Sequence, residues 1–364
     1  MSLLGLFAGQ LASRLGLPRV VAYVLVGVLF STDFLGRFFP INSTDWVRPL
    51  TDISLNVIAF IIGGSITLPQ LQRMGKSMLG IAFFESLGAM LMVFLAVLLF
   101  IPPIANIPPV SLALAFSAIS STTAPAGTIA VLHQYHGKGT FSSTLLGVVA
   151  LDDAFGMIFF SIMMTFLVGG SLEQSLEMAL MHILGAILLG CFAGFCLAKL
   201  LVLVGEKNLL LPLVFGFFAR LFLYSAGDKL FGSIYFLEET VFLAFFTLAG
   251  THFHFSVFTE HLDLILWYFF ARILGKILGA ALGGKLTKSP LLVTRWLGFA
   301  LVPQAGVAIG LALTLSHQEQ FSGIGLVVVN VILATTLIYE LVGPLSARFA
   351  LKKAGEIEIR KISR

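Results

Sequence analysis

Long unbroken apolar segments limit what this chain can fold into more than any other feature of its sequence. The segment from Leu145 to Val168 is one example, and its only charged residues are Asp152 and Asp153. A helix needs about 20 predominantly apolar residues to cross the hydrocarbon core of a bilayer. The strands of a membrane β-barrel would instead alternate apolar and polar residues. The pattern therefore predicts membrane-spanning helices.

Composition supports this fold class and excludes several others. Hydrophobic residues make up 58% of the 364 residues and charged residues only 11%, whereas soluble proteins carry about 25% charged residues. A soluble enzyme, a disordered chain, a coiled coil and a disulfide scaffold are thereby excluded. The two cysteines, Cys191 and Cys196, lie within one apolar run, and we interpret them as packing residues.

The apolar segments give the expected architecture, an all-α polytopic membrane protein. With short loops, the length accommodates about 12 spans. A transmembrane domain is expected over 1–350, followed by a short basic tail over 351–364. The positive-inside rule puts that tail in the cytoplasm. The segments expected to be helical are 3–16, 19–33, 51–68, 77–101, 109–133, 143–169, 175–204, 208–226, 233–252, 262–284, 291–315 and 322–350.

Two of these segments are interrupted by polar residues, proline and glycine, one near 117–127 and one near 301–310. Proline removes a backbone donor, and the freed backbone groups are tolerated at membrane depth only when buried in protein or facing a water-filled cavity. A pair of interrupted spans indicates a transporter site, whereas the alternative is two proline-kinked helices without a site. The prolines and glycines at the interruptions are Pro125, Gly127, Pro303 and Gly306.

Asp152 and Asp153 are the clearest charges at membrane depth, because both of their flanks are apolar. Two adjacent carboxylates repel each other in a low dielectric, so they must be protonated or accompanied by a cation. The doublet therefore predicts a site where a proton and a metal cation compete. The alternative is a helix end that dips into a loop.

Arg272 and Lys276 are the candidate counter-ions. They are four residues apart and share one helix face. Either could compensate the charge of an aspartate, and the alternative is that both side chains extend to the membrane interface.

Other ionisable residues are weaker candidates. We expect structural ion pairs at the charged ones, and ordinary or pH-sensing roles at the histidines. The charged residues are Glu85, Arg220, Glu238, Glu239, Arg295 and Glu340. The histidines are His133, His136, His182, His252, His254, His261 and His317.

Several segments together resemble the monovalent cation/proton antiporters, specifically the second branch of that superfamily. That branch includes bacterial sodium/proton antiporters and glutathione-gated potassium efflux systems. The resemblance covers nearly the whole chain, and the order and spacing of its motifs carry it. The motifs lie at 14–27, 122–125, 150–156, 245–250, 272–276 and 302–310.

The resemblance implies a role for each site residue. Asp153 would bind the cation and the proton alternately, Asp152 would pair with Lys276, and Thr122 and Thr123 would offer oxygens beside the site. A double aspartate favours Na⁺ or Li⁺, with K⁺/H⁺ exchange of the potassium efflux type as the alternative. The family also implies a homodimer in a bacterial inner membrane, two inverted repeats with crossing broken helices, and no cofactor, enzymatic activity or nucleic-acid partner.

The chain departs from the family pattern in two ways. The interrupted spans are fifth and eleventh in our count, which would make them parallel, whereas inverted repeats need an odd number of helices between equivalent elements. Residues 205–260 also look one helix short, so we expect 11–13 helices. In addition, we expect no nucleotide-binding regulatory domain of the kind that potassium efflux systems carry after the last span, and therefore no ligand gating of that kind.

Three other functions are weighed against antiport. An intramembrane aspartyl protease needs two aspartates on different helices, and here they are adjacent. A cation channel would pass ions without proton counter-movement. A sodium-coupled solute symporter would instead take up an organic solute.

Overall fold

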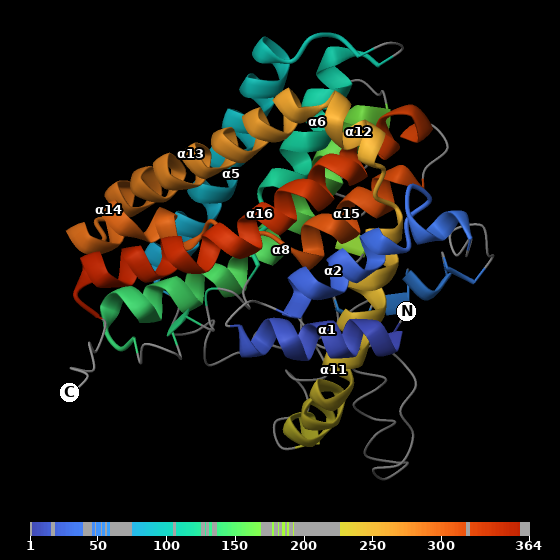
Figure 1. Ribbon diagram of the computed structural model, residues 1–364. Helices are drawn as coiled ribbons and strands as arrows, with labels where there is room; N and C mark the ends of the chain where they lie inside the picture. Colours follow the sequence, from blue (N-terminus) through green and yellow to red (C-terminus); the bar gives the residue numbers. More distant parts are fainter. Residues whose placement is uncertain are drawn as a thin grey trace, which may run out of the picture.

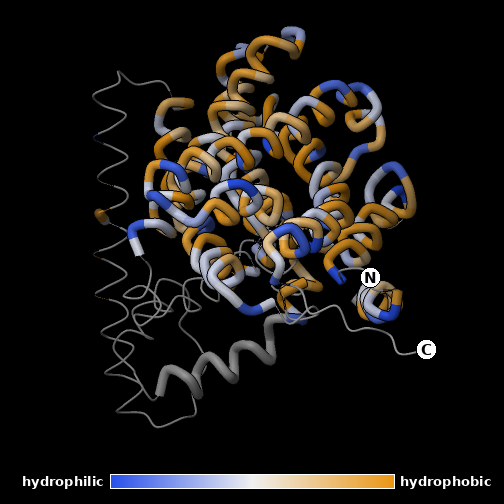
Figure 2. Tube along the Cα trace, turned by 90° about the vertical axis from the view of Figure 1, so that its left-hand side faces the viewer, coloured by the Kyte–Doolittle hydropathy of each residue, from blue (hydrophilic) through white to orange (hydrophobic). Residues whose placement is uncertain are grey.

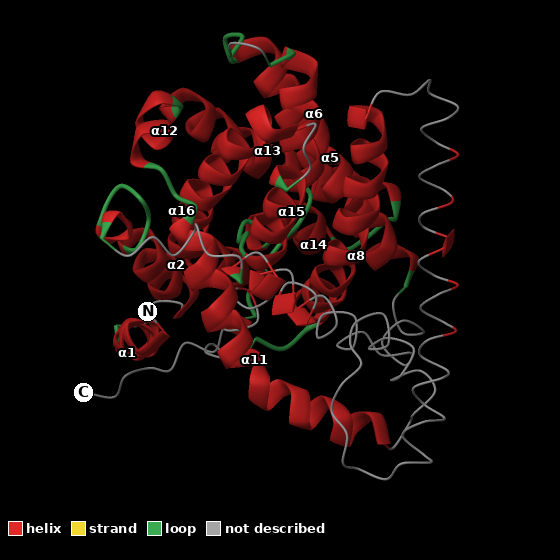
Figure 3. Ribbon diagram, turned by 90° about the vertical axis from the view of Figure 1, so that its right-hand side faces the viewer, coloured by secondary structure: helices red, strands yellow, loops and turns green. Residues whose placement is uncertain are grey.

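The computed structural model describes residues 2–15, 19–38, 75–104, 107–124, 137–168, 226–317 and 321–356, with isolated positions within 46–58, 128–132 and 177–192. Within these ranges every regular element is a helix (Figure 3). Three expected spans, 51–68, 175–204 and 208–226, lie largely or wholly outside the described residues, and the predicted inverted repeats remain a prediction for this reason.

Helices of very different length make up the described part of the chain (Figure 1). They are α1 (Ser2–Arg14), α2 (Arg19–Leu29), the 3-10 turn η1 (Leu35–Arg37), α5 (Lys76–Phe100), α6 (Pro109–Ser120), α8 (Thr140–Val168), α11 (Ala226–Thr251), α12 (Phe255–Glu260), α13 (Leu262–Leu286), α14 (Leu291–Ala300), α15 (Gly306–Ser316) and α16 (Ser322–Ala354). Within the described ranges, four segments are long and apolar enough to cross a membrane: Lys76–Phe100, Thr140–Leu167, Leu262–Leu286 and Gly323–Ala354.

Proline and glycine set several helix boundaries. Pro109 occupies the first turn of α6, where its missing N–H costs nothing. Gly355 ends α16 in the left-handed conformation, with φ of 74°. The last helix therefore continues four residues beyond the predicted end at 350.

Both interrupted spans are broken as the sequence predicts. α6 ends at Ser120, and residues 122–124 are not helical. The second span is divided into α14 and α15 by the non-helical residues 302–305. Short half-helices at these two places leave backbone ends inside the protein, where side chains must satisfy them.

Glycines let α5 and α13 pack in close contact along their length (Figure 1). A Cβ added at Gly279 would overlap the carbonyl oxygen of Phe84, and one at Gly88 would lie 2.5 Å from the carbonyl oxygen of Gly275. Gly80 meets Gly283 at the far end, so the two helices are antiparallel. Small residues permit this approach between membrane helices.

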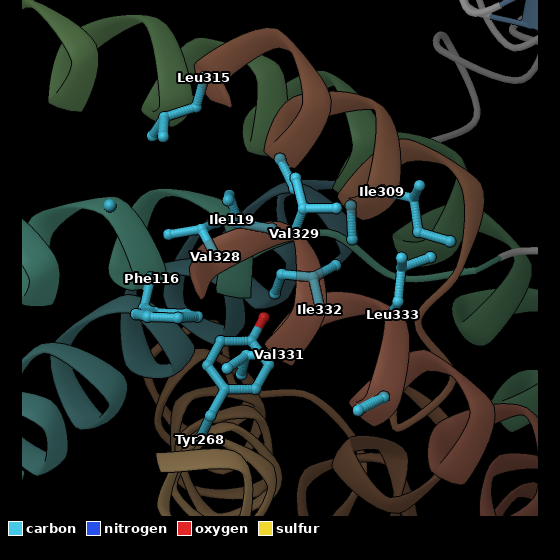
Figure 4. Close-up of a cluster of buried hydrophobic side chains, with 14 of the residues drawn as sticks. Phe116, Ile119, Tyr268, Ile309, Leu315, Val328, Val329, Val331, Ile332 and Leu333 are labelled. Carbon is cyan, nitrogen blue, oxygen red and sulfur yellow. The ribbon is translucent and has the colours of Figure 1, made fainter. Parts of the chain in front are cut away.

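The largest core cluster lies where α6, α13, α15 and α16 converge. Figure 4 shows Phe116 and Ile119 of α6, Tyr268 of α13 and Val328 of α16 pointing into it. Apolar residues predominate along the helices, as the orange tube segments of Figure 2 show, and many large apolar side chains are exposed on their outer faces. On α13 these residues recur every four positions, at Leu262, Leu266, Phe270, Leu274, Leu278 and Leu282. Such a stripe suits contact with lipid.

Candidate functional site

The two helix breaks cross each other. The backbone N–H of Ala124 donates to the carbonyl oxygen of Pro303 at 2.9 Å. The Thr123 hydroxyl donates to the carbonyl of Leu301 at 3.4 Å. Of the predicted break residues, Pro303 lies in the second break and Gly306 begins α15, while Pro125 and Gly127 lie outside the described residues.

Arg272 ties the two breaks together. Its guanidinium donates to the carbonyl oxygens of Ser120 at 2.9 Å, Thr122 at 2.5 Å and Val302 at 2.7 Å. It also lies over the ring of Tyr339, 4.6 Å from the centroid. A cation is favourable at the C-terminal end of a helix. Arg272 thus compensates the dipoles of helix ends, and no ion pair joins it to an aspartate among the described residues.

Gln304 satisfies another carbonyl at the end of α6. Its amide donates to the carbonyl of Ile119 at 3.1 Å, and its own oxygen accepts from the Tyr268 hydroxyl at 3.1 Å. The sequence alone assigns no role to either residue, because a neutral polar side chain in an apolar run carries no distinctive signal.

Lys276 is the cation that contacts the aspartate doublet. Its ammonium group lies 3.1 Å from Asp152 Oδ2 and 2.8 Å from Glu85 Oε2, and it donates to the Thr123 hydroxyl at 2.6 Å. A further hydrogen bond of 2.6 Å reaches the carbonyl of Ser121. All three charged side chains are fully buried. One lysine therefore pairs with two carboxylates and also binds the first break.

Glu85 reaches this cluster because of the α5–α13 register. Gly279 abuts the backbone of Phe84 and Glu85, which brings Glu85 opposite Lys276, one turn away. Ser86 joins the same group, because its hydroxyl lies 2.9 Å from Asp152 Oδ1 and 3.1 Å from Glu85 Oε1. We expected Glu85 only as a structural ion pair, and Ser86 was missed.

Asp153 differs from its neighbour. It is 1% exposed, and neither of its carboxylate oxygens has a hydrogen-bond partner in the described part of the chain. Gly156, one turn further along α8, packs against Thr122, since an added Cβ would lie 2.6 Å from Thr122 Cγ2. The doublet therefore lies next to the first break, with one carboxylate paired and the other not.

Thr122 and Thr123 are both buried at the crossing. The Thr122 hydroxyl donates to the carbonyl of Ile119 at 3.2 Å and accepts from Gln304 at 3.4 Å. Its oxygen retains acceptor capacity for a further partner. The described residues contain no group of three or more His, Cys, Asp and Glu that could hold a multi-ligand metal ion.

Of the remaining weaker candidates, Glu239 forms an ion pair in the described part of the chain. Glu239 pairs with Arg19 at an exposed position, as expected of a structural pair. His252 directly follows the last residue of α11, and its side chain is partly buried. The side chains of Arg220, Glu238, His133, His136 and His182 lie outside the described residues.

Buried charges at two crossing helix breaks are typical of polytopic helical transporters. The sequence profile of the family described as sodium/hydrogen exchanger, transmembrane, matches residues 1–234. The chain belongs to this family.

A relative and a solved structure are similar over almost the whole chain. A protein of Enterococcus hirae named Na(+)/H(+) antiporter is 24% identical over 378 residues, covering 94% of each chain. The sodium proton antiporter MjNhaP1 from Methanocaldococcus jannaschii, in its pH 8 structure, superposes with a TM-score of 0.74 at 18% identity, covering 98% of this chain and 97% of that one. An electron-microscopy structure of MjNhaP1 gives a TM-score of 0.71 at 17% identity. The fold is therefore an antiporter fold.

Proposed function

We propose that this protein exchanges Na⁺ or Li⁺ for protons by alternating access, with Asp153 carrying the cation and the proton in turn. Family membership supports cation/proton antiport as the general activity of this membrane protein. The single observation that carries the finer proposal is the contrast within the doublet. Asp152 is paired with Lys276, whereas Asp153 is buried with no partner among the described residues.

The chemistry of Asp153 follows from its surroundings. An ionised carboxylate without a partner is costly in a low dielectric, so Asp153 is stable when a proton or a cation neutralises it. Hard monovalent cations take oxygen ligands, and the Thr122 hydroxyl lies on the neighbouring break. One occupant excludes the other, which couples cation binding to proton release.

Hydrogen bonds from three side chains stabilise the backbone at the helix breaks next to Asp153. Arg272, Lys276 and Gln304 donate to the carbonyl oxygens that the α6 end would otherwise leave unsatisfied. These hydrogen bonds neutralise the partial charges of the half-helix ends at the crossing. The electric field there therefore comes mainly from the proton or cation bound at Asp153. Exposure of Asp153 to each side in turn then completes the cycle.

The test is cation-driven proton movement in proteoliposomes with an imposed pH gradient and an internal pH reporter. We expect wild type to respond to Na⁺ or Li⁺ and the Asp153→Asn variant to lose the response. Asp263→Asn is the matched control, because it makes the same change at an exposed position in the first turn of α13. Exchange retained by Asp153→Asn would refute the assignment, and a response to K⁺ alone would support the potassium alternative.

We also propose a membrane topology, a location and an oligomeric state for this protein. We propose a transmembrane domain over 1–350, a cytoplasmic tail over 351–364, a bacterial inner-membrane location and a homodimer. The family and the apolar helices support a multi-pass membrane protein. The finer statements stay predictions.

A further inference from the structure

Glu340 on α16 is a buried carboxyl group that the proposed exchange site does not use. Its side chain is 4% exposed. In the described part of the chain it has neither a hydrogen bond nor an ion pair, unlike Glu85 and Asp152. We expected a structural ion pair at Glu340 from the sequence, and that expectation is wrong within the described residues.

The backbone carbonyl of Glu340 also lacks its usual helical hydrogen-bond donor. Pro344 lies within α16, four residues after Glu340, and its ring nitrogen cannot donate to the carbonyl of Glu340. One turn before Glu340, the Thr336 hydroxyl is buried and has no hydrogen-bond partner in the described part of the chain. The buried Thr336 hydroxyl and the Glu340 carboxyl therefore lie on one stretch of α16, where Pro344 also deprives the Glu340 carbonyl of its usual helical donor.

The depth of Glu340 follows from a contact at the end of α16. The Glu356 carboxylate accepts hydrogen bonds of 2.8 Å from the backbone N–H groups of Phe141 and Ser142, at the start of α8. From this end α8 and α16 run in opposite chain directions (Figure 1). At 1.5 Å per residue, Asp153 lies about 18 Å along α8 from Phe141, and Glu340 about 21 Å along α16 from its last residue, Ala354. The two carboxyl groups thus lie at similar distances along their helices from this end, within about one helical turn.

The face of α16 that carries Glu340 also packs toward α8. Ala347 and Leu351 follow Glu340 at seven and eleven residues, which keeps them on one helix face. Both belong to a core cluster with Leu145 and Val148 of α8. Nearby, a Cβ at Gly343 would lie 2.6 Å from Pro303 Cγ, so this part of α16 abuts the second break.

The two buried cations of α13 have partners other than Glu340. Arg272 is hydrogen-bonded to carbonyls of both breaks, and Lys276 to Asp152 and Glu85. The titratable residues at described positions of the helices that pack against α16 are Arg19 and Tyr23 on α2, Asp152 and Asp153 on α8, Glu260 on α12, Asp263, Tyr268, Arg272, Lys276 and Lys285 on α13, and Arg295 on α14; α6 and α15 carry none.

We infer that Glu340 is a second proton-binding site, which relays protons between water and Asp153. In this step the Glu340 carboxyl donates its proton, through water, to the Asp153 carboxylate as the cation leaves. The Glu340 carboxylate then takes a proton from the aqueous side. This inference rests on the proposed function and adds the route by which protons reach its site.

The pH profile of exchange tests the relay. We expect Glu340→Gln to lower the exchange rate roughly tenfold on the alkaline side of the profile, where protons are scarce, with the KM for Na⁺ unchanged. Glu340→Asp should restore the rate in part, because it keeps a carboxyl group. Glu239→Gln is the matched control, since that carboxylate is exposed, and its profile should match wild type. A Glu340→Gln profile equal to wild type, or lowered equally at every pH, would overturn the relay.

A second measurement does not depend on turnover. In infrared difference spectra between acid and alkaline pH, wild type should show a carboxylic acid carbonyl band that Glu340→Gln lacks and that Asp153→Asn retains. A band unaffected by Glu340→Gln would refute titration of Glu340 while leaving Asp153 as the exchange site. Exchange retained in Asp153→Asn would instead refute the proposed function itself.

Discussion

A single residue, Lys276, compensates the charge of two buried carboxylates in this site. Its ammonium group is buried between Glu85 and Asp152. Removing one partner of a buried ion pair leaves an uncompensated charge, which costs far more than the net contribution of the pair itself. Two carboxylates depend on this one cation.

We predict that Lys276→Ala lowers the free energy of unfolding by about 3–5 kcal/mol. The exposed pair of Arg19 and Glu239 provides the comparison, and Arg19→Ala should cost less than about 1 kcal/mol. Thermal unfolding of the detergent-solubilised variants measures both. Equal losses at the two positions would show that burial does not govern the energy of these pairs.

Sequence and structure agree best where a residue is chemically conspicuous. Asp152, Asp153, Arg272 and Lys276 stand out because a charge inside an apolar run is rare. Pro303 stands out because proline cannot continue a helix. These residues therefore allow the position of the site to be predicted from the sequence alone.

The sequence does not show which charged side chains pair with one another, because the pairing depends on how the helices pack. Arg272 and Lys276 share a helix face, yet only Lys276 meets Asp152, while Arg272 binds carbonyls at the breaks. Glu85 joins them through a register that glycines far from it in sequence determine. Glu340 looked like a candidate ion pair and proved to have no partner among the described residues.

At the scale of elements, the α5–α13 contact positions the site. The two helices approach so closely at Gly279 that an added Cβ would overlap the backbone of α5. Backbone atoms cannot move aside as the end of a flexible side chain can. Separation of the helices would draw Glu85 away from Lys276.

We predict that Gly279→Ala destabilises the protein by about 1–3 kcal/mol through overpacking, and lowers exchange by disturbing the Glu85–Lys276 pair. Gly323→Ala is the matched control, because no atom lies within 4 Å of the position of its new Cβ. It should be neutral or stabilise slightly, as alanine does relative to glycine in a helix. Unfolding temperature and exchange rate are the measurements. A Gly279→Ala protein as stable and active as the control would contradict the packing argument.

At the scale of the whole molecule, the site joins parts of the chain that are far apart in sequence. The family profile ends at residue 234, yet Lys276 and the second break lie beyond it. Only the folded chain brings Asp152 and Lys276 together, so an ion that binds at the doublet, as we propose, would stabilise the entire fold. Ligands that bind the native state alone stabilise it by RT ln(1 + [L]/Kd).

We therefore predict that Na⁺ raises the unfolding temperature of the solubilised protein, with choline at equal concentration as the ionic-strength control. At a Na⁺ concentration of 100 times Kd, the stabilisation should be about 2.7 kcal/mol. Protons compete for Asp153, so the Na⁺ effect should be larger at alkaline than at acid pH. Asp153→Asn should abolish the effect, and Asp263→Asn should retain it. If choline stabilised the protein equally, or if Asp153→Asn responded as wild type does, the cation would not be binding at the doublet.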